Sequence, residues 1–194
     1  ATAGPIVVSP DTLTGGSHTH QLLVLVPGET YTPGKTTAPI GRTGSANFTA
    51  ALGHTPPLAG ESFPVTVIGT DRFSNRIFDT ESPSVQLSAN ANLYSSYNPS
   101  ASFTLNTGSN TVFATINRAT TTATFTATQT GTPQTYTYSV ATSTGFVVEH
   151  GAASRLQLLV PNETAVPGYT TGKSGSPAIP FTAGATYYAT VNAT

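Results

Sequence analysis

Apolar and polar residues alternate along most of the chain. From Thr122 to Thr128 the apolar side chains occupy the odd positions and threonine the even ones. A period of two gives a strand one core-facing side and one solvent-facing side. No window supports an amphipathic helix, because threonine, valine and aromatic residues dominate and the 15 prolines and 18 glycines interrupt every long stretch. The pattern predicts strands near 21–26, 47–52, 62–69, 83–89, 101–105, 111–117, 121–129, 135–142 and 145–149.

Turn residues separate these short strands at a spacing of roughly 8–12 residues, which is typical of an all-β sandwich. The stretch 27–46 is rich in proline, glycine and threonine, so we expect a long loop there. We therefore predict an all-β fold in which two sheets pack face to face.

Part of the sequence occurs twice. Leu-Leu-Val-Leu-Val-Pro-Gly-Glu-Thr returns 134 positions later as Leu-Gln-Leu-Leu-Val-Pro-Asn-Glu-Thr. The recurring segments are 22–30 with 156–164, 33–34 with 167–168, 41–45 with 172–176, and 59–67 with 183–191. Leu22 and Val24 recur as apolar residues whereas Leu23 recurs as Gln157, so we expect the inward face to be preserved and the outward face to vary. Self-similarity of this kind indicates an array of units that bury surface against their neighbours.

The repeat divides the chain into three parts. Residues 20–150 are predicted to form one complete sandwich, and residues 151–194 the first part of a second repeat. Gly-Pro-Ile-Val-Val at 4–8 resembles Gly-Phe-Val-Val at 145–148, which directly precedes the second copy. Residues 1–19 are therefore expected to hold the tail strand of a preceding repeat and a linker.

Charge is scarce in this chain. Charged residues make up 8% of it, against roughly 25% in an average soluble domain, and 37 threonines fill many of the polar positions. The net charge of −1 and the absence of a Lys/Arg cluster disfavour nucleic acid and anionic membranes as partners. No apolar run reaches the roughly 18 residues needed to span a membrane. Without cysteine there is no disulfide or thiolate site. Together with the repeats, this composition suggests an exported protein, extracellular or at the cell surface.

The repeated segments resemble a known family. Residues 156–168, 172–177 and 183–193 are similar to tandem repeats of very large bacterial surface proteins. The strand, Asp-x-x-x-Asn, strand pattern around Asp71 and Asn75 resembles bacterial immunoglobulin-like domains of the invasin and adhesin type. The resemblance implies an immunoglobulin-like β-sandwich within an extracellular stalk, adhesin or filament, and it implies no catalytic residues.

One cluster of oxygen-bearing side chains, Asp71, Asn75, Asp79 and Glu81, could form part of a calcium site between units. The alternative is that Asp71 and Asn75 hydrogen-bond the backbone of a tight turn. No other cofactor is expected.

A second candidate is the tyrosine-rich segment at 94–98. Tyr94, Tyr97 and Asn98 are predicted to lie in an exposed loop that contacts sugars or proteins. The alternative is a turn whose tyrosines pack into the core.

Three sequons and a histidine pair complete the candidates. Asn47, Asn162 and Asn192 each begin an Asn-x-Thr sequon, which permits glycosylation, as in a glycoprotein. His18 and His20 would share one face of an extended segment and could ligate a transition metal.

Two functions follow as expectations. The first is a non-enzymatic structural module of an extracellular assembly (a stalk, sheath, surface layer or filament) whose partners are other copies or adjacent repeats. Unpaired strand edges in 151–194 would recruit a further strand. The second is an adhesin module that binds carbohydrate or protein through loops at one end of the sandwich. An enzyme is not expected, and no Gly-x-Ser-x-Gly elbow is present.

Overall fold

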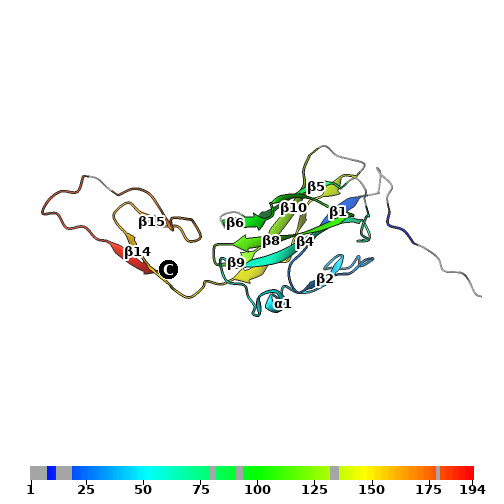
Figure 1. Ribbon diagram of the computed structural model, residues 1–194, viewed down its shortest axis with the longest axis horizontal. Helices are drawn as coiled ribbons and strands as arrows, with labels where there is room; N and C mark the ends of the chain where they lie inside the picture. The colour runs from blue at the N-terminus through cyan, green and yellow to red at the C-terminus, as the bar shows by residue number, and fades with distance from the viewer. Residues whose placement is uncertain (1–7, 12–18, 79–81, 91–93, 132–135, 178–179) are drawn as a thin grey trace, which may run out of the picture.

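Two β-sheets pack face to face in the larger part of the computed structural model, which describes residues 8–11, 19–78, 82–90, 94–131, 136–177 and 180–194 (Figure 1). We call residues 20–150 the first unit and residues 151–194 the second unit. The expected tail strand at 1–8 lies outside the described residues, apart from Val8. No helix in the described part of the chain has the length and apolar character needed to cross a membrane.

Apart from a short hairpin described below, the strands of the first unit divide between the two sheets and one separate pair. The first sheet has the spatial order β11 (Tyr138–Ser139), β1 (His20–Leu25), β4 (Ser62–Asp71), β8 (Ser109–Ile116) and β6 (Ser95–Asn98). The second sheet has the order β12 (Ala141–Thr142), β10 (Phe125–Gln129), β5 (Ser84–Ala89) and β7 (Ser102–Thr104). The separate pair consists of β9 (Thr120–Ala123) and β13 (Phe146–Val148).

The strand order agrees in part with that of an immunoglobulin-like sandwich. Strands β1, β4, β8 and β6 take the places of A, B, E and D, and β5, β10 and β12 those of C, F and G. Every pairing in the two sheets is antiparallel except that of β1 with β11. The predicted all-β sandwich is confirmed.

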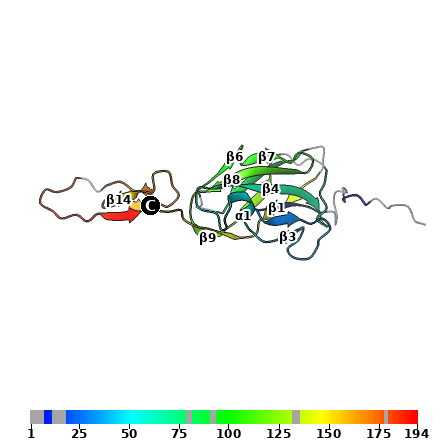
Figure 2. The same ribbon diagram turned by 60° about the horizontal axis from the view of Figure 1, so that its bottom comes forward.

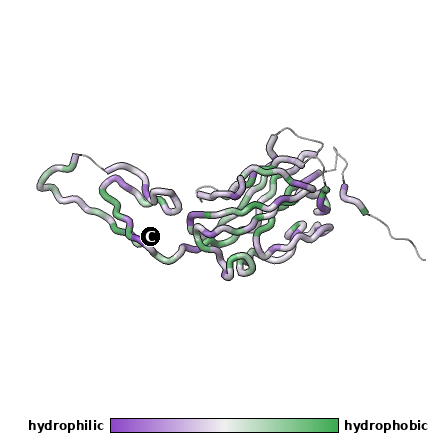
Figure 3. Tube along the Cα trace, in the orientation of Figure 1, coloured by the Kyte–Doolittle hydropathy of each residue, from purple (hydrophilic) through white to green (hydrophobic). Residues whose placement is uncertain are grey.

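The core lies between the two sheets, on the faces that the alternation assigns to it. Val65 and Val67 of β4 and Leu87 of β5 are fully buried, and the tube coloured by hydropathy shows apolar residues along the facing strands (Figure 3). An aromatic cluster made of Phe48, Phe63, Phe125 and Phe146 fills one part of the core, with ring centroids 4.8 to 6.1 Å apart. Such rings contribute large buried areas and further edge-to-face attraction.

The strand predicted at 47–52 is wrong. A short helix, α1 (Thr49–Leu52), occupies this segment, and Gly53 ends it in the left-handed conformation with φ 84°. Phe48 and Leu52 both pack on the core, as residues four positions apart on a helical turn can do. The spacing of Phe48 and Leu52, which suggested the alternation of a strand, is therefore that of one helical turn.

The long loop predicted at 27–46 contains a hairpin. Strands β2 (Glu29–Tyr31) and β3 (Arg42–Gly44) pair antiparallel, and the hairpin lies alongside the first sheet (Figure 2). Tyr31 packs on a second apolar cluster made of Leu23, Leu25 and Ile68. The hairpin therefore covers the outward face of β1.

The second unit repeats this arrangement with fewer strands. Strand β14 (Leu156–Leu159) pairs antiparallel with β17 (Thr190–Ala193), and β15 (Thr164–Ala165) pairs with β16 (Lys173–Ser174). Leu158 faces Val191 just as Val24 faces Val67 in the first unit, so the two ladders have the same register. The second unit thus comprises the counterparts of β1, β2, β3 and β4.

From the aromatic cluster we predict that alanine substitutions at two phenylalanines lower stability by very different amounts. Replacing buried Phe63 by alanine removes a ring at the centre of the cluster, so we expect the free energy of unfolding to fall by about 3–5 kcal/mol. Phe113 on β8 is half exposed, so Phe113→Ala is the matched control and should cost less than about 1 kcal/mol. Urea unfolding measures both changes, and equal losses would contradict the described core.

Candidate functional site

A buried glutamate holds the hairpin of the first unit in place. Glu29 Oε2 accepts a hydrogen bond from the Val26 N–H (3.0 Å), and its Oε1 accepts one from the Thr144 hydroxyl. Arg42 Nε lies 3.4 Å from the same carboxylate, and Arg42 Nη1 donates to the Val24 carbonyl (2.7 Å). The Glu29 side chain is only 1% exposed. This carboxylate therefore ties the hairpin to β1 and to the segment before β13.

The second unit builds the same anchor from its own copy of the motif. Glu163 Oε2 accepts from the Val160 N–H (3.1 Å), and Lys173 Nζ donates to Glu163 Oε1 (2.7 Å). The Lys173 hydrogen bond is the main reason why the pKa of Glu163 is lowered. Sequence reasoning missed this pair of anchors. A usable signal was present, because the chain has only eight acidic residues and one of them recurs with its basic partner in both copies.

Below this hairpin the second unit has a polar residue where the first has an apolar one. Gln157 takes the place of Leu23, and its Nε2 donates to the Gly172 carbonyl of the hairpin (2.7 Å). Gln157 Oε1 in turn accepts a hydrogen bond from Asn192 Nδ2 of β17 (3.2 Å). Gln157 thus contacts the hairpin of the second unit through a hydrogen bond, whereas Leu23 belongs to the apolar cluster on which the hairpin of the first unit packs.

The Asp-x-x-x-Asn segment forms a tight turn after β4. Asp71 Oδ1 accepts from the N–H groups of Phe73 (2.9 Å) and Asn75 (2.8 Å), and Oδ2 accepts from Asn75 Nδ2 (3.1 Å). The two bonds to backbone N–H groups are those expected if this segment forms a tight turn instead of a calcium site. Asp79 and Glu81 lie outside the described residues, and the described part of the chain contains no group of three potential metal ligands. Calcium binding stays a prediction.

The same turn receives the segment that precedes the first unit. The Asp11 N–H donates to Asp71 Oδ2 (2.9 Å), and His20 Nε2 lies 3.1 Å from the Asp11 carbonyl oxygen. His20 is buried, and its ring centroid lies 4.6 Å from that of Tyr136. His18 lies outside the described residues. Asp11, which sequence reasoning did not single out, therefore attaches residues 8–11 to the first unit.

The tyrosine-rich segment forms strand β6 and the residue before it. Tyr97 packs against Phe125 in the core with its ring centroid 6.4 Å away, its hydroxyl lies 3.1 Å from Ser95 Oγ, and burial raises its pKa. Asn98 is exposed at the end of β6. Tyr94 is half-buried, and its ring lies 5.5 Å from that of Tyr169 in the second unit. Ligand binding by these three residues stays a prediction.

The three sequons differ in their surroundings. Asn47 is exposed, and its Oδ1 accepts from the Thr49 N–H (3.0 Å) at the start of α1. Asn162 is exposed in a turn, with φ 72°. Asn192 is half-buried, with its amide nitrogen bonded as described above. Glycosylation of these residues stays a prediction.

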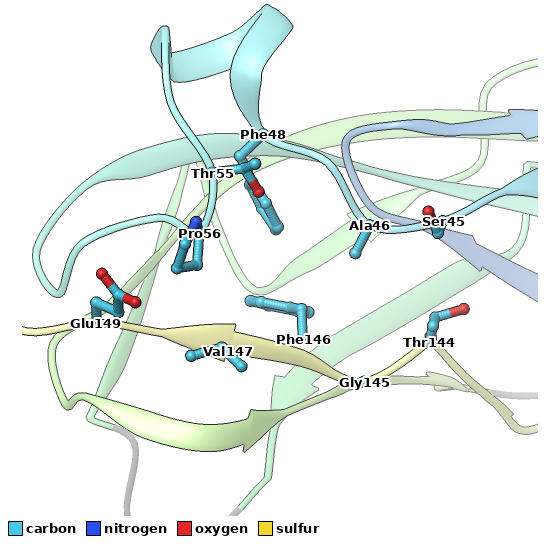
Figure 4. Close-up of a pocket in the computed structure, with 10 residues that line it drawn as sticks. All are labelled: Ser45, Ala46, Phe48, Thr55, Pro56, Thr144, Gly145, Phe146, Val147 and Glu149. Atoms are coloured by element: carbon cyan, nitrogen blue, oxygen red, sulfur yellow. The ribbon is translucent and has the colours of Figure 1, made fainter.

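An open hollow of about 400 Å³ lies between the segment 45–56 and β13 (Figure 4). Phe48 and Phe146 point into it, while Thr144 and Glu149 stand at its two ends (Figure 4). Its lining is mostly apolar, and Glu149 is the one ionisable residue among the lining residues. The hollow could take an apolar side chain.

A separate apolar surface lies on the second unit. Leu158 and Val191 are 56% and 59% exposed, whereas their counterparts Val24 and Val67 are fully buried. Leu156, the counterpart of buried Leu22, is also largely exposed. We call the residues Leu156, Leu158 and Val191 the open face.

Comparison with protein-family models, with curated proteins and with solved structures found no match. The arrangement of the residues themselves is therefore the basis for a function.

The glutamate anchor predicts a large effect of one substitution. In Glu29→Ala the Val26 N–H and the Arg42 guanidinium lose a buried partner, so we expect unfolding to become easier by about 3 kcal/mol. Glu149→Ala, at an exposed glutamate, is the control and should change stability by less than about 0.5 kcal/mol. Thermal and urea unfolding would measure both changes. A Glu29→Ala chain as stable as the parent would contradict a stabilising role of the Glu29 carboxylate.

Proposed function

We propose that the chain is a non-enzymatic structural repeat module of an extracellular or cell-surface assembly, such as a stalk, sheath, surface layer or filament. In this proposal units are joined by β-strand addition. The observation that carries it is the open face, which repeats a sheet of the first unit in the same register and which no strand among the described residues covers.

The free edge of β17 supports strand addition. The N–H and C=O of Thr194 both bond with Arg155, so residues in phase with Thr194 direct their backbone groups toward β14. Val191 and Ala193, in the opposite phase, direct theirs away from β14. In the first unit Gly69, the counterpart of Ala193, donates its N–H to the Gly108 carbonyl (2.9 Å). A strand that adds to β17 would therefore meet the same N–H and C=O groups that β4 presents on this edge in the first unit.

The free energy of burial favours binding of a further strand to the second unit. A two-stranded sheet is marginal in water by itself, and burial of one large aliphatic side chain contributes about 1.5–3 kcal/mol. The open face presents three such side chains, and among the described residues β14 is the one strand that pairs with β17. An exposed apolar edge of this kind recruits a strand.

The first unit indicates which strand fits. Val67 of β4, the counterpart of Val191, faces Asn110 of β8, and β8 alternates buried Val112 and Ala114 with more exposed residues. The partner is therefore a strand with the alternation of β8, supplied by another copy or by an adjacent repeat. The scarcity of charge on the chain supports close packing between copies, because few charges would have to be desolvated.

Blocking the edge tests this proposal. Val191→Pro removes an N–H that points away from β14, so the ladder between β14 and β17 should remain while strand addition is lost. In sedimentation velocity and electron microscopy, the parent chain should form end-to-end oligomers as its concentration rises, and Val191→Pro should stay monomeric.

Val191→Ala is the matched control, because it shortens the same side chain and keeps the N–H. It should associate more weakly than the parent but still associate, and amide protection in β14 would show that all three chains keep the ladder. A parent chain that remains monomeric at high concentration, or a proline variant that associates as well as the parent, would rule strand addition out.

A further inference from the structure

We propose that Tyr94 and Asn117, at one end of the first unit, form a docking surface for the Pro-Gly loop of the unit that follows. Through this contact successive units would be held at a fixed angle. The proposal rests on the proposed function only in treating the two units as neighbours in an array, and it concerns a contact within one chain.

The first unit itself holds the docking surface in shape. Ser95 and Ile116 face each other at the end of the β6–β8 pairing, so Tyr94 and Asn117 lie next to each other just beyond it. Asn117 Nδ2 donates to the Tyr94 carbonyl (2.6 Å), and Tyr94 has φ 48°, in the left-handed region. A non-glycine residue in this region is uncommon and persists where its surroundings require it. Contacts within the first unit therefore support the conformation of Tyr94.

The second unit contacts this surface through two consecutive residues. The ring of Tyr169 lies 5.5 Å from the ring of Tyr94, with an angle of 51° between their planes, which is a favourable tilted arrangement. A Cβ atom at Gly168 would lie 2.8 Å from the Asn117 carbonyl oxygen and 2.9 Å from Arg118 Cβ. The backbone of the loop thus rests directly on the first unit, where only glycine leaves enough room.

The first copy of the motif provides an internal comparison. Gly34 has nearly the same conformation as Gly168, with φ 75° against 82°. The nearest atom to a Cβ at Gly34 would be Asn75 Oδ1, at 4.0 Å, and Pro33 and Gly34 are both exposed. The glycine therefore has a similar φ at both positions, but among the described residues it meets another unit only at Gly168. A repeated head-to-tail contact between unlike surfaces generates a ring where its rotation closes and an open array where it does not.

A distance measurement within one chain tests whether this contact holds the two units at a fixed angle. The chain has no cysteine, so Thr128→Cys and Thr190→Cys, at exposed positions in the two units, accept one spin label each. Double electron–electron resonance, at a concentration where the chain does not associate, should give a narrow distance distribution for the doubly labelled parent. Gly168→Asn should broaden it at least twofold, because the larger side chain would displace the loop from Asn117.

Gly34→Asn is the matched control, since both glycines have positive φ and only Gly168 contacts another unit. Asn162 shows that asparagine adopts this conformation within the second unit, with φ 72°. A second variant, Tyr169→Ala, should also broaden the distribution, whereas Tyr188→Ala, at an exposed tyrosine of the same unit, should not.

Three results would overturn the inference: a broad distribution in the parent, a narrow one in Gly168→Asn, or equal broadening by Gly34→Asn. If the parent chain gives a narrow distance distribution but never associates, the contact between the two units is supported and the proposed strand addition is refuted. The two proposals therefore fail in different measurements.

Discussion

A two-stranded ladder with apolar side chains on both faces is not stable in water until both faces are covered. Strands β1 and β4 form such a ladder in the first unit, with Val24 and Val67 on one face and Leu23 and Ile68 on the other. The second sheet covers the first of these faces, and the β2–β3 hairpin covers the other. Strands β8 and β6 extend the sheet to which the ladder belongs.

The hairpin depends on a charge in an otherwise nearly uncharged chain. A buried carboxylate is costly unless its oxygens are hydrogen-bonded and its charge is paired, and Glu29 meets both conditions. The second unit keeps the carboxylate as Glu163 and pairs it with a lysine instead of an arginine. The side chain under the hairpin differs between the units, Leu23 in the first and Gln157 in the second, while both units keep the glutamate anchor.

The sequence predicts the sandwich well because burial on one face of a strand imposes a period of two. The register of the second ladder also follows from the sequence, since the offsets of the repeated segments align the counterparts of β1 and β4. Helix α1 escaped prediction because a four-residue helix shows only one spacing, that of Phe48 and Leu52. The β2–β3 hairpin escaped because strands of three residues are too short to display alternation.

The candidate sites were harder to predict than the fold, because their positions depend on partners that are distant in sequence. The contact of Tyr94 with Tyr169 joins residues of different units, and no local pattern announces it. Tyr97 enters the core because β6 pairs with β8, which decides the face on which each residue of 95–98 lies. The turn at Asp71 is local, and its hydrogen bonds agree with the alternative that its sequence pattern left open.

Amide hydrogen exchange resolved by residue tests most directly whether the second ladder needs a further strand. The N–H of Asn192 points toward β14, so the account predicts protection of this amide at every concentration of the chain. The amides of Val191 and Ala193 point to the free edge, and they should exchange rapidly in dilute solution and become protected as the concentration rises. Protection of Val191 and Ala193 that does not change with concentration, or an unprotected Asn192, would contradict the account.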